Sequence, residues 1–262
     1  MRNQWQYFLL AVGFFTRIPV PSFADFQESD LNHSVQYFPL VGIIVGLVGA
    51  FSFYIAHAVL PMEVAVLISM ASTIYITGAF HEDGLADSAD GMGGGWDRER
   101  ILTIMQDSRL GTYGVAALFF ALLTKFAILK ALSPAWLPAI LVAGHALSRL
   151  CAVWLMATLN YTKSSGKAKP LATQIVGTDL IVSHLFGLLP FLCLVFYMNP
   201  INGLWMLKCL FIGIFPVALA WIWWRTKVKQ WLGGYTGDTL GAMQQITEIA
   251  FYLGVLICAQ MT

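Results

Sequence analysis

One short segment, GAFHEDGLADSADG, gathers carboxylates in an otherwise apolar chain. Seven of the 14 acidic residues of the chain lie in the range 82–107. Asp83, Asp87 and Asp90 are spaced i, i+4, i+7, and this spacing places them on one face of a helix. Carboxylates so placed repel one another, whereas a bound Mg²⁺ ion, which prefers oxygen ligands, would relieve the repulsion. The segment therefore predicts a Mg²⁺ site, with a solvated acidic face as the alternative.

The surroundings of this acidic segment favour the metal site. No lysine or arginine interrupts the range 82–90, glycines flank it, and it directly follows an apolar run. His81 precedes the acids and has two interpretations. It is either a general base or a residue at the interface where a membrane span ends, and the sequence alone does not decide between them.

The next motif, DSRLGTYG, places Asp107 and Arg109 just before another apolar run. Asp107 is either a further metal ligand or the partner of Arg109. The planar guanidinium of Arg109 suits a pair of phosphate oxygens. A surface salt bridge between the two residues explains the motif equally well.

A third polar cluster, GGYTGDTLGAMQQITE, lies near the C-terminus. Gly237, Asp238 and Thr239 form a loop whose backbone N–H groups can approach an anion closely, and we predict that they bind such a group. A turn with a helix cap at Asp238 is the alternative. Gln244 and Glu248 follow at i, i+4 spacing and would share one face of the next helix.

The composition indicates what positions these residues. The chain is 58% hydrophobic and 11% charged, with a mean hydropathy of +0.71, against about 25% charged residues in an ordinary soluble domain. The net charge of +1 gives no basic surface for nucleic acid. We predict an all-α, polytopic membrane helix bundle, formed by a single integral-membrane domain over 1–262.

Seven apolar runs are long enough to cross a bilayer. We predict spanning helices at about 35–60, 64–80, 111–132, 136–159, 179–198, 203–224 and 241–261. Trp5–Phe15 is short for a span and is predicted to be an interfacial helix in the membrane plane, ending before Pro19.

The distribution of basic residues predicts the orientation. Seven spans place the loops 1–34, 81–110, 160–178 and 225–240 on one side, and these loops carry many lysines and arginines, whereas the opposite loops carry none. Positive charge marks the cytoplasmic side. The acidic segment and the loop at Asp238 therefore lie together on the cytoplasmic side, where they can form one site.

Several charged or titratable residues are predicted to lie inside spans, among them Lys125, Lys130, His145 and Arg149. Lys125 lies deep in the third span and should have a buried partner, because an unpaired charge in the bilayer is costly. His145 and Arg149 share a face of the fourth span. Structural pairing and direct substrate contact both remain open for them.

The motifs FFTRIPVP, FPLVGIIVG, HEDGLADSADG, IMQDSRLGTYG and GYTGDTLGAMQQITE occur in the order seen in cobalamin synthases, and the chain resembles this family from about Thr16 to Glu248. Ser88 and Glu82 are small departures from the family pattern, so Glu82 is a weaker candidate ligand. A fainter likeness links the acidic segment to the CDP-alcohol phosphotransferases.

The resemblance implies an adenosylcobinamide-GDP ribazoletransferase. Such an enzyme transfers the cobinamide-phosphoryl group to α-ribazole or its 5′-phosphate and releases GMP, in the last assembly step of the coenzyme B12 nucleotide loop. The family requires Mg²⁺ and works in the bacterial inner membrane. A shared membrane surface with other enzymes of the cobalamin pathway is a further expectation.

Together these arguments give a site hypothesis. Asp83, Asp87 and Asp90, together with Asp107, hold Mg²⁺, and Arg109 binds a phosphoryl oxygen. Asp238 and its glycine loop bind the second nucleotide or complete the metal site, and a carboxylate or His81 accepts the hydroxyl proton. The competing hypotheses are a CDP-alcohol phosphotransferase and a cation or corrinoid transporter. A transporter also requires a polar entrance on the outer side, and the predicted outer loops offer none, which argues against transport.

Overall fold

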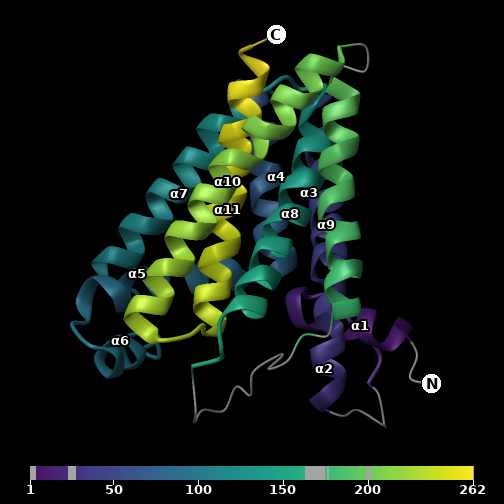
Figure 1. The fold of residues 1–262 in the computed structure, drawn as a ribbon. Coiled ribbons are helices and arrows are strands. Elements are labelled where there is room, and N and C mark those ends of the chain that lie inside the picture. The colour runs from purple at the N-terminus through teal and green to yellow at the C-terminus, as the bar shows by residue number, and fades with distance from the viewer. Residues whose placement is uncertain (1–3, 23–27, 163–174, 176, 199–201, 262) are drawn as a thin grey trace.

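The protein is a bundle of long helices that lie side by side in the computed structural model, with the short helices gathered at one end (Figure 1). The structure describes all residues except 1–3, 23–27, 163–174, 176, 199–201 and 262. Its helices are α1 (Gln4–Phe15), α2 (Glu28–Ser34), the 3₁₀ turn η1 (Val35–Tyr37), α3 (Phe38–His57), α4 (Met62–Thr77), α5 (Phe80–Gly94), α6 (Arg98–Ile104), α7 (Thr112–Ala131), α8 (Leu137–Thr158), α9 (Gly177–Met198), α10 (Gly203–Leu232) and α11 (Gly237–Ala259). Among the described residues, β-type pairing is limited to one bridge, between Tyr161 and Tyr235. The prediction of an all-α bundle is confirmed.

Most of the long helices have the length and composition of membrane spans. Among the described residues, six helices could each cross a membrane, and the bent pair α4–α5 would count as a seventh. The outer surface of the bundle is apolar, with large exposed side chains such as Phe51, Phe120 and Phe196. An apolar outer surface is what a helix facing lipid requires, so the chain is a multi-pass membrane protein.

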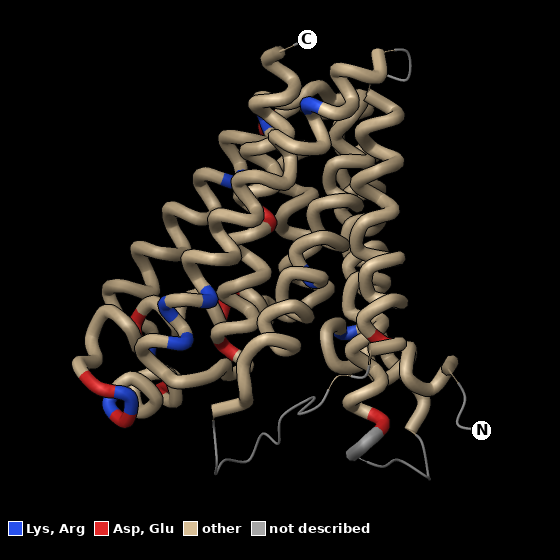
Figure 2. Tube along the Cα trace, in the orientation of Figure 1, with Lys and Arg blue, Asp and Glu red and all other residues tan. Residues whose placement is uncertain are grey.

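Charged residues are concentrated at the end of the bundle that carries α1, α2 and α6 (Figure 2). At the opposite end, Lys130 forms an ion pair with Glu63, with 3.2 Å between Nζ and Oε1. Helix α1 has 12 residues, too few to cross a bilayer core of about 30 Å, and it lies at the charged end, as expected for an interfacial helix (Figure 1).

A sharp bend between α4 and α5 sets the position of the acidic segment. The two helices meet at 86°, and the turn consists of Gly78 and Ala79, both with positive φ (65° and 59°). The backbone N–H of Arg17 donates to the carbonyl of Ile76 at 2.8 Å, and the Arg17 guanidinium lies over the ring of Tyr75. The motif around Arg17 thus holds the bend in place, so the acidic segment is a helix packed into the bundle rather than a surface loop.

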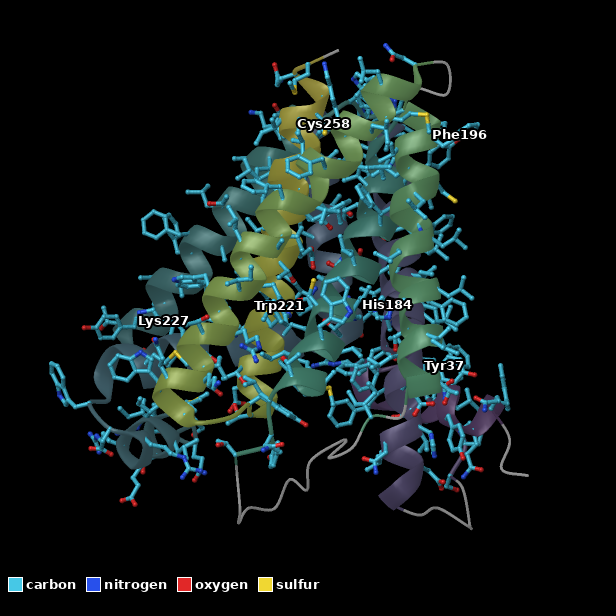
Figure 3. The ribbon with its side chains drawn as sticks, viewed as in Figure 1. Tyr37, His184, Phe196, Trp221, Lys227 and Cys258 are labelled. Carbon is cyan, nitrogen blue, oxygen red and sulfur yellow. The ribbon has the colours of Figure 1, made fainter. Side chains whose placement is uncertain are left out.

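Helix α10 is longer than predicted, continuing past position 224 to Leu232. Trp224, Val228 and Leu232 are buried at i, i+4, i+8 spacing, so apolar packing stabilises the extra turns despite the three basic residues between them. Higher in the same helix, the indole N–H of Trp221 donates to the carbonyl of Cys151 on α8 at 3.1 Å (Figure 3).

Candidate active site

A cavity of about 210 Å³ opens among α5, α8 and the start of α11. Two carboxylates, Asp83 and Asp238, are on its wall, together with the guanidinium-bearing Arg149 and the amide-bearing Gln244. The rest of the lining is mostly aromatic: Phe14, Phe15, Phe38, Phe80, Tyr161 and Tyr235. The cavity therefore combines acidic, basic and aromatic groups, the kinds of group that bind a nucleotide and its phosphates.

Close contact between α5 and α11 places the two carboxylates on the same cavity. A Cβ atom at Gly84 would lie 2.7 Å from the backbone oxygen of Asp238, and one at Gly241 would lie 3.2 Å from the backbone oxygen of His81. Only glycine allows backbones to approach this closely. The acidic segment and the C-terminal glycine cluster therefore meet, as the sequence predicts from their common side.

The first turn of α11 is capped by Thr236 rather than by Asp238. The N–H of Thr239 donates to Thr236 Oγ1 at 3.2 Å, and the N–H of Thr236 donates to Thr239 Oγ1 at 2.8 Å, which forms a reciprocal capping box. The hydroxyl of Thr236 also donates to the Asp238 carboxylate at 3.3 Å. Asp238 is thus free of the capping role and faces the cavity, where Gly237 also lies.

His81 is buried on the cavity wall. Its ring stacks on Phe15, with 5.8 Å between the ring centroids and 13° between the planes. The stacking on Phe15 fits the interpretation of His81 as a residue packed where the span bends. The position of His81 on the cavity wall fits a general base as well. Its catalytic role stays a prediction.

Asp90 anchors the start of α7. Its carboxylate accepts hydrogen bonds from the N–H groups of Gly111 at 2.7 Å and Gly114 at 2.9 Å. These groups lie at the N-terminus of α7, where backbone donors lack partners within the helix and the helix dipole favours negative charge. The glycines are needed here, because a Cβ at either position would collide with the Asp90 carboxylate.

Asp107 and Arg109 form an exposed pair. The guanidinium of Arg109 donates to both carboxylate oxygens of Asp107, with Nε 3.0 Å from Oδ1. These hydrogen bonds lower the pKa of Asp107 to about 2. The surface salt bridge is therefore formed, and neither residue lines the cavity. Roles for Asp107 in metal binding and for Arg109 in phosphate binding stay predictions.

The four predicted metal ligands are not gathered into one cluster. Within the described residues, no group of three or more His, Cys, Asp or Glu side chains is placed to hold a metal ion. Asp83 and Asp90 are seven residues apart on α5, a rise of about 10.5 Å along the helix, and Asp90 is turned toward α7. Asp87 lies between them and is partly buried. The spacing of Asp83, Asp87 and Asp90 places all three on one helix. It does not gather their carboxylates around one metal ion.

Tyr161 and Tyr235 are cavity residues that the sequence analysis missed. Their rings meet edge to face, with 5.5 Å between centroids, and backbone hydrogen bonds of 2.9 Å join Thr162 to Tyr235 and Tyr235 to Asn160. Burial raises the pKa of the Tyr235 phenol to about 12 and, with a contribution from Asp238, raises the pKa of Tyr161. Both phenols therefore stay protonated at neutral pH. No signal in the sequence marked Tyr161, since it lies outside the motifs on which the family resemblance rests.

A match to a known protein family identifies the relatives of this chain. The model of the family described as cobalamin-5-phosphate synthase matches residues 7–256. The chain belongs to the cobalamin-5-phosphate synthase family.

Individual relatives agree with this assignment. The adenosylcobinamide-GDP ribazoletransferase of Ralstonia pickettii is 41% identical, over 98% of this chain and 97% of the relative. The enzyme of the same name from Shewanella frigidimarina is 42% identical, over 97% and 95%, and that from Vibrio parahaemolyticus is 40% identical, over 98% and 94%. No solved structure matches the chain. The resemblance noted from the motifs is therefore confirmed at the level of the family.

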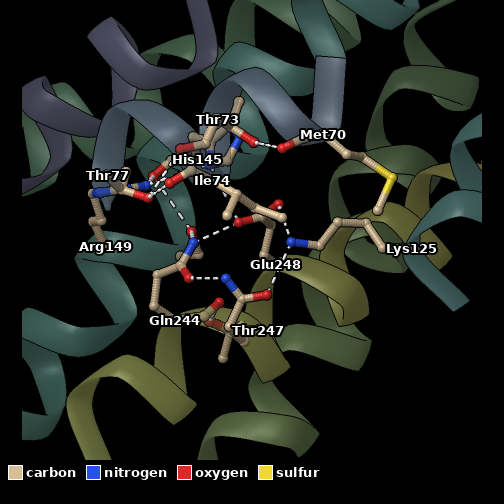
Figure 4. Close-up of polar contacts among 12 residues, drawn as sticks. Met70, Thr73, Ile74, Thr77, Lys125, His145, Arg149, Gln244, Thr247 and Glu248 are labelled. Carbon is tan, nitrogen blue, oxygen red and sulfur yellow. Dashed lines mark hydrogen bonds and ion pairs between the residues drawn. The ribbon is translucent and has the colours of Figure 1, made fainter. Parts of the chain in front are cut away.

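This member of the family also contains a buried polar network next to the cavity (Figure 4). Lys125 Nζ lies 3.0 Å from Glu248 Oε1, and His145 Nδ1 lies 3.3 Å from Glu248 Oε2. The expectation that Lys125 has a buried partner is confirmed. The partner is Glu248, which the sequence placed on one face of the last span but did not connect to Lys125.

Proposed function

We propose that this chain is an adenosylcobinamide-GDP ribazoletransferase. It transfers the cobinamide-phosphoryl group of adenosylcobinamide-GDP to a ribose hydroxyl of α-ribazole or α-ribazole 5′-phosphate. A new P–O bond forms to the ribose oxygen, the P–O bond of the diphosphate to the guanosine-bearing phosphate breaks, and GMP leaves while the hydroxyl proton is released. The observation that carries this proposal is the full-length similarity to ribazoletransferases at about 41% identity.

The cavity supports this proposal independently. Its aromatic wall suits nucleotide bases, which stack on phenol and phenyl rings. Gly237 has no atom within 4 Å of the place where its Cβ would lie, so a phosphate can approach the backbone at the start of α11. The N-terminus of a helix favours an anion at that position.

The donors in the cavity fit Mg²⁺. This ion is usually held by one or two carboxylates, several waters and substrate phosphate, and Asp83 and Asp238 supply two carboxylates on one wall. Mg²⁺ bound there would neutralise negative charge that develops on the phosphoryl oxygens. We infer that Asp83 and Asp238 are the metal-holding pair and that Asp90 acts by anchoring α7.

The remaining groups have roles that follow from their positions. Tyr161, Tyr235 and Phe15 exclude water and hold the ring systems of the substrates, while the Gln244 amide donates to Ser148 and Glu248 and so fixes the inner wall of the cavity. His81 lies two residues before Asp83 on α5 and lines the cavity, and it is the candidate acceptor of the hydroxyl proton. We further propose that the chain lies in the bacterial inner membrane with the cavity on the cytoplasmic side, since basic residues mark that side.

The test uses the purified full chain in lipid nanodiscs. Adenosylcobinamide-GDP and α-ribazole 5′-phosphate are supplied with Mg²⁺, and GMP and the corrinoid product are separated by chromatography. We expect one GMP for each corrinoid product formed, no reaction after EDTA treatment, and recovery on adding Mg²⁺. Undiminished turnover in EDTA would remove Mg²⁺ from the proposal. Release of CMP from CDP-diacylglycerol, with no GMP from the corrinoid substrate, would replace the proposal with a phospholipid synthase.

A further inference from the structure

Arg149 is a cation buried inside the bundle. It lies on α8, a helix with the composition of a span, and only 2% of its surface is exposed. Its side chain nevertheless reaches the wall of the cavity that holds Asp83 and Asp238. A charge at this depth in a membrane protein is costly unless it is paired or serves a ligand.

The hydrogen-bonding capacity of Arg149 is largely unused. One nitrogen, Nη1, donates to the backbone oxygen of His145 at 3.0 Å and lies 3.4 Å from Nδ1 of the same residue. The buried Nε atom has no hydrogen-bond partner. Among the residues that the structure describes, no carboxylate forms an ion pair with Arg149. A guanidinium has five N–H donors and stays charged in proteins, so most of its donors remain available.

The nearby carboxylates already have other partners. Glu248 contacts Lys125 through Oε1 and His145 through Oε2, and Gln244 donates its amide to Oε2 (Figure 4). Glu82 accepts a hydrogen bond from the amide of Gln245 at 2.9 Å. Lys125 thus has a direct carboxylate partner, whereas among the described residues Glu248 and Glu82 act on the charge of Arg149 only from beyond ion-pair distance.

We propose that Arg149 forms a phosphate-binding subsite at the inner wall of the cavity, taking a phosphate group of the nucleoside diphosphate substrate. The planar fork of guanidinium donors matches two phosphate oxygens. The backbone carbonyl of His145 fixes one edge of the fork, and Glu248 and Lys125 hold His145 in place as positioning residues. The inference rests on the proposed function for the identity of the substrate, while the subsite itself rests on the contacts of Arg149.

The competing explanation is that Arg149 only stabilises the bundle through His145. The two explanations differ in ligand binding, since a structural cation would leave the affinity for phosphate unchanged in any variant that still folds. Binding must therefore be measured separately from turnover.

The experiment measures binding of GDP, inorganic pyrophosphate and guanosine to the full chain in nanodiscs by equilibrium dialysis with labelled ligand. Arg149→Gln removes the charge, and Arg149→Lys keeps the charge but loses the fork. Arg225→Gln is the matched control, because Arg225 is a partly exposed arginine whose guanidinium contacts Thr158 and does not line the cavity. Thermal unfolding of each variant monitors the fold.

We expect Arg149→Gln to weaken GDP and pyrophosphate binding by about 30-fold, as loss of charged hydrogen bonds predicts. Arg149→Lys should lose less affinity for GDP and pyrophosphate. The binding of guanosine should be the same in every variant, and Arg225→Gln should bind all three ligands as the wild type does. GDP affinity within about twofold of the wild-type value in a folded Arg149 variant, or no phosphate-dependent binding by the wild type, overturns the subsite. If Arg149→Gln does not fold, the GDP affinity of Arg149→Lys relative to the wild type decides between the two explanations. Absence of GMP formation in the transfer assay would instead overturn the proposed function, while leaving Arg149-dependent GDP binding as evidence for the subsite.

Discussion

Gly84 on α5 lies directly against Asp238 at the start of α11, so that a Cβ atom at position 84 would be 2.7 Å from the backbone oxygen of Asp238. This contact joins two motifs that are separated by most of the chain. The placement of Asp83 and Asp238 on one cavity therefore depends on the absence of a side chain at residue 84.

Replacing Gly84 by alanine should push α5 away from α11. Transfer activity should fall at least about tenfold, because a displacement near 1 Å is enough to disturb a catalytic arrangement, while the helix content stays unchanged. The measurement is the rate of GMP release together with circular dichroism. Gly177→Ala is the control, since nothing lies within 4 Å of its Cβ position. Wild-type activity in Gly84→Ala would show that the α5–α11 contact does not shape the site.

Asp83→Asn should abolish transfer and leave the protein folded. The Asp83 side chain is exposed toward the cavity, so an isosteric amide disturbs no packing but removes a negative charge that Mg²⁺ needs. The measurement is turnover at saturating Mg²⁺, alongside the thermal unfolding temperature. Turnover near the wild-type rate would contradict the metal assignment of Asp83.

Asp90→Asn should act mainly on stability. The amide loses the negative charge at the N-terminus of α7, and its single oxygen can accept from only one of the N–H groups of Gly111 and Gly114 while its NH₂ group faces the other, so the free energy of unfolding should fall by about 1–3 kcal/mol. Residual transfer should respond normally to the Mg²⁺ concentration. A raised Mg²⁺ requirement with unchanged thermal stability would instead return Asp90 to the metal site.

The fold was largely predictable because bilayer spans carry a strong signal. Runs of about 20 apolar residues and the one-sided distribution of lysine and arginine indicate the helices and the common side of Asp83 and Asp238. Helix boundaries were less predictable. Residues 225–232 look polar in the sequence, yet Val228 and Leu232 are buried and continue α10.

The details of the site depended on tertiary placement that spacing does not encode. The i, i+7 pair of Asp83 and Asp90 shares a helix face, but only the packing of α7 reveals that Asp90 accepts hydrogen bonds from Gly111. Similarly, the sequence places Arg149 in a span, and the rotation of α8 decides that it reaches the cavity. Tyr161 approaches the cavity through a backbone bridge to Tyr235, a long-range pairing without a local pattern.

The buried pair Lys125–Glu248 gives the last prediction. Lys125→Met alone leaves the Glu248 carboxylate, 1% exposed, without its main counter-charge, and should lower the free energy of unfolding by about 3–5 kcal/mol. Glu248→Gln alone leaves the buried Lys125 ammonium without its carboxylate partner, and it should lower the free energy of unfolding in the same way. The double variant removes both charges and should be more stable than either single variant, because neither partner is left buried without the other. Unfolding in detergent measures all four proteins as a double-mutant cycle. Additive losses in the double variant would mean that the two charges do not stabilise each other.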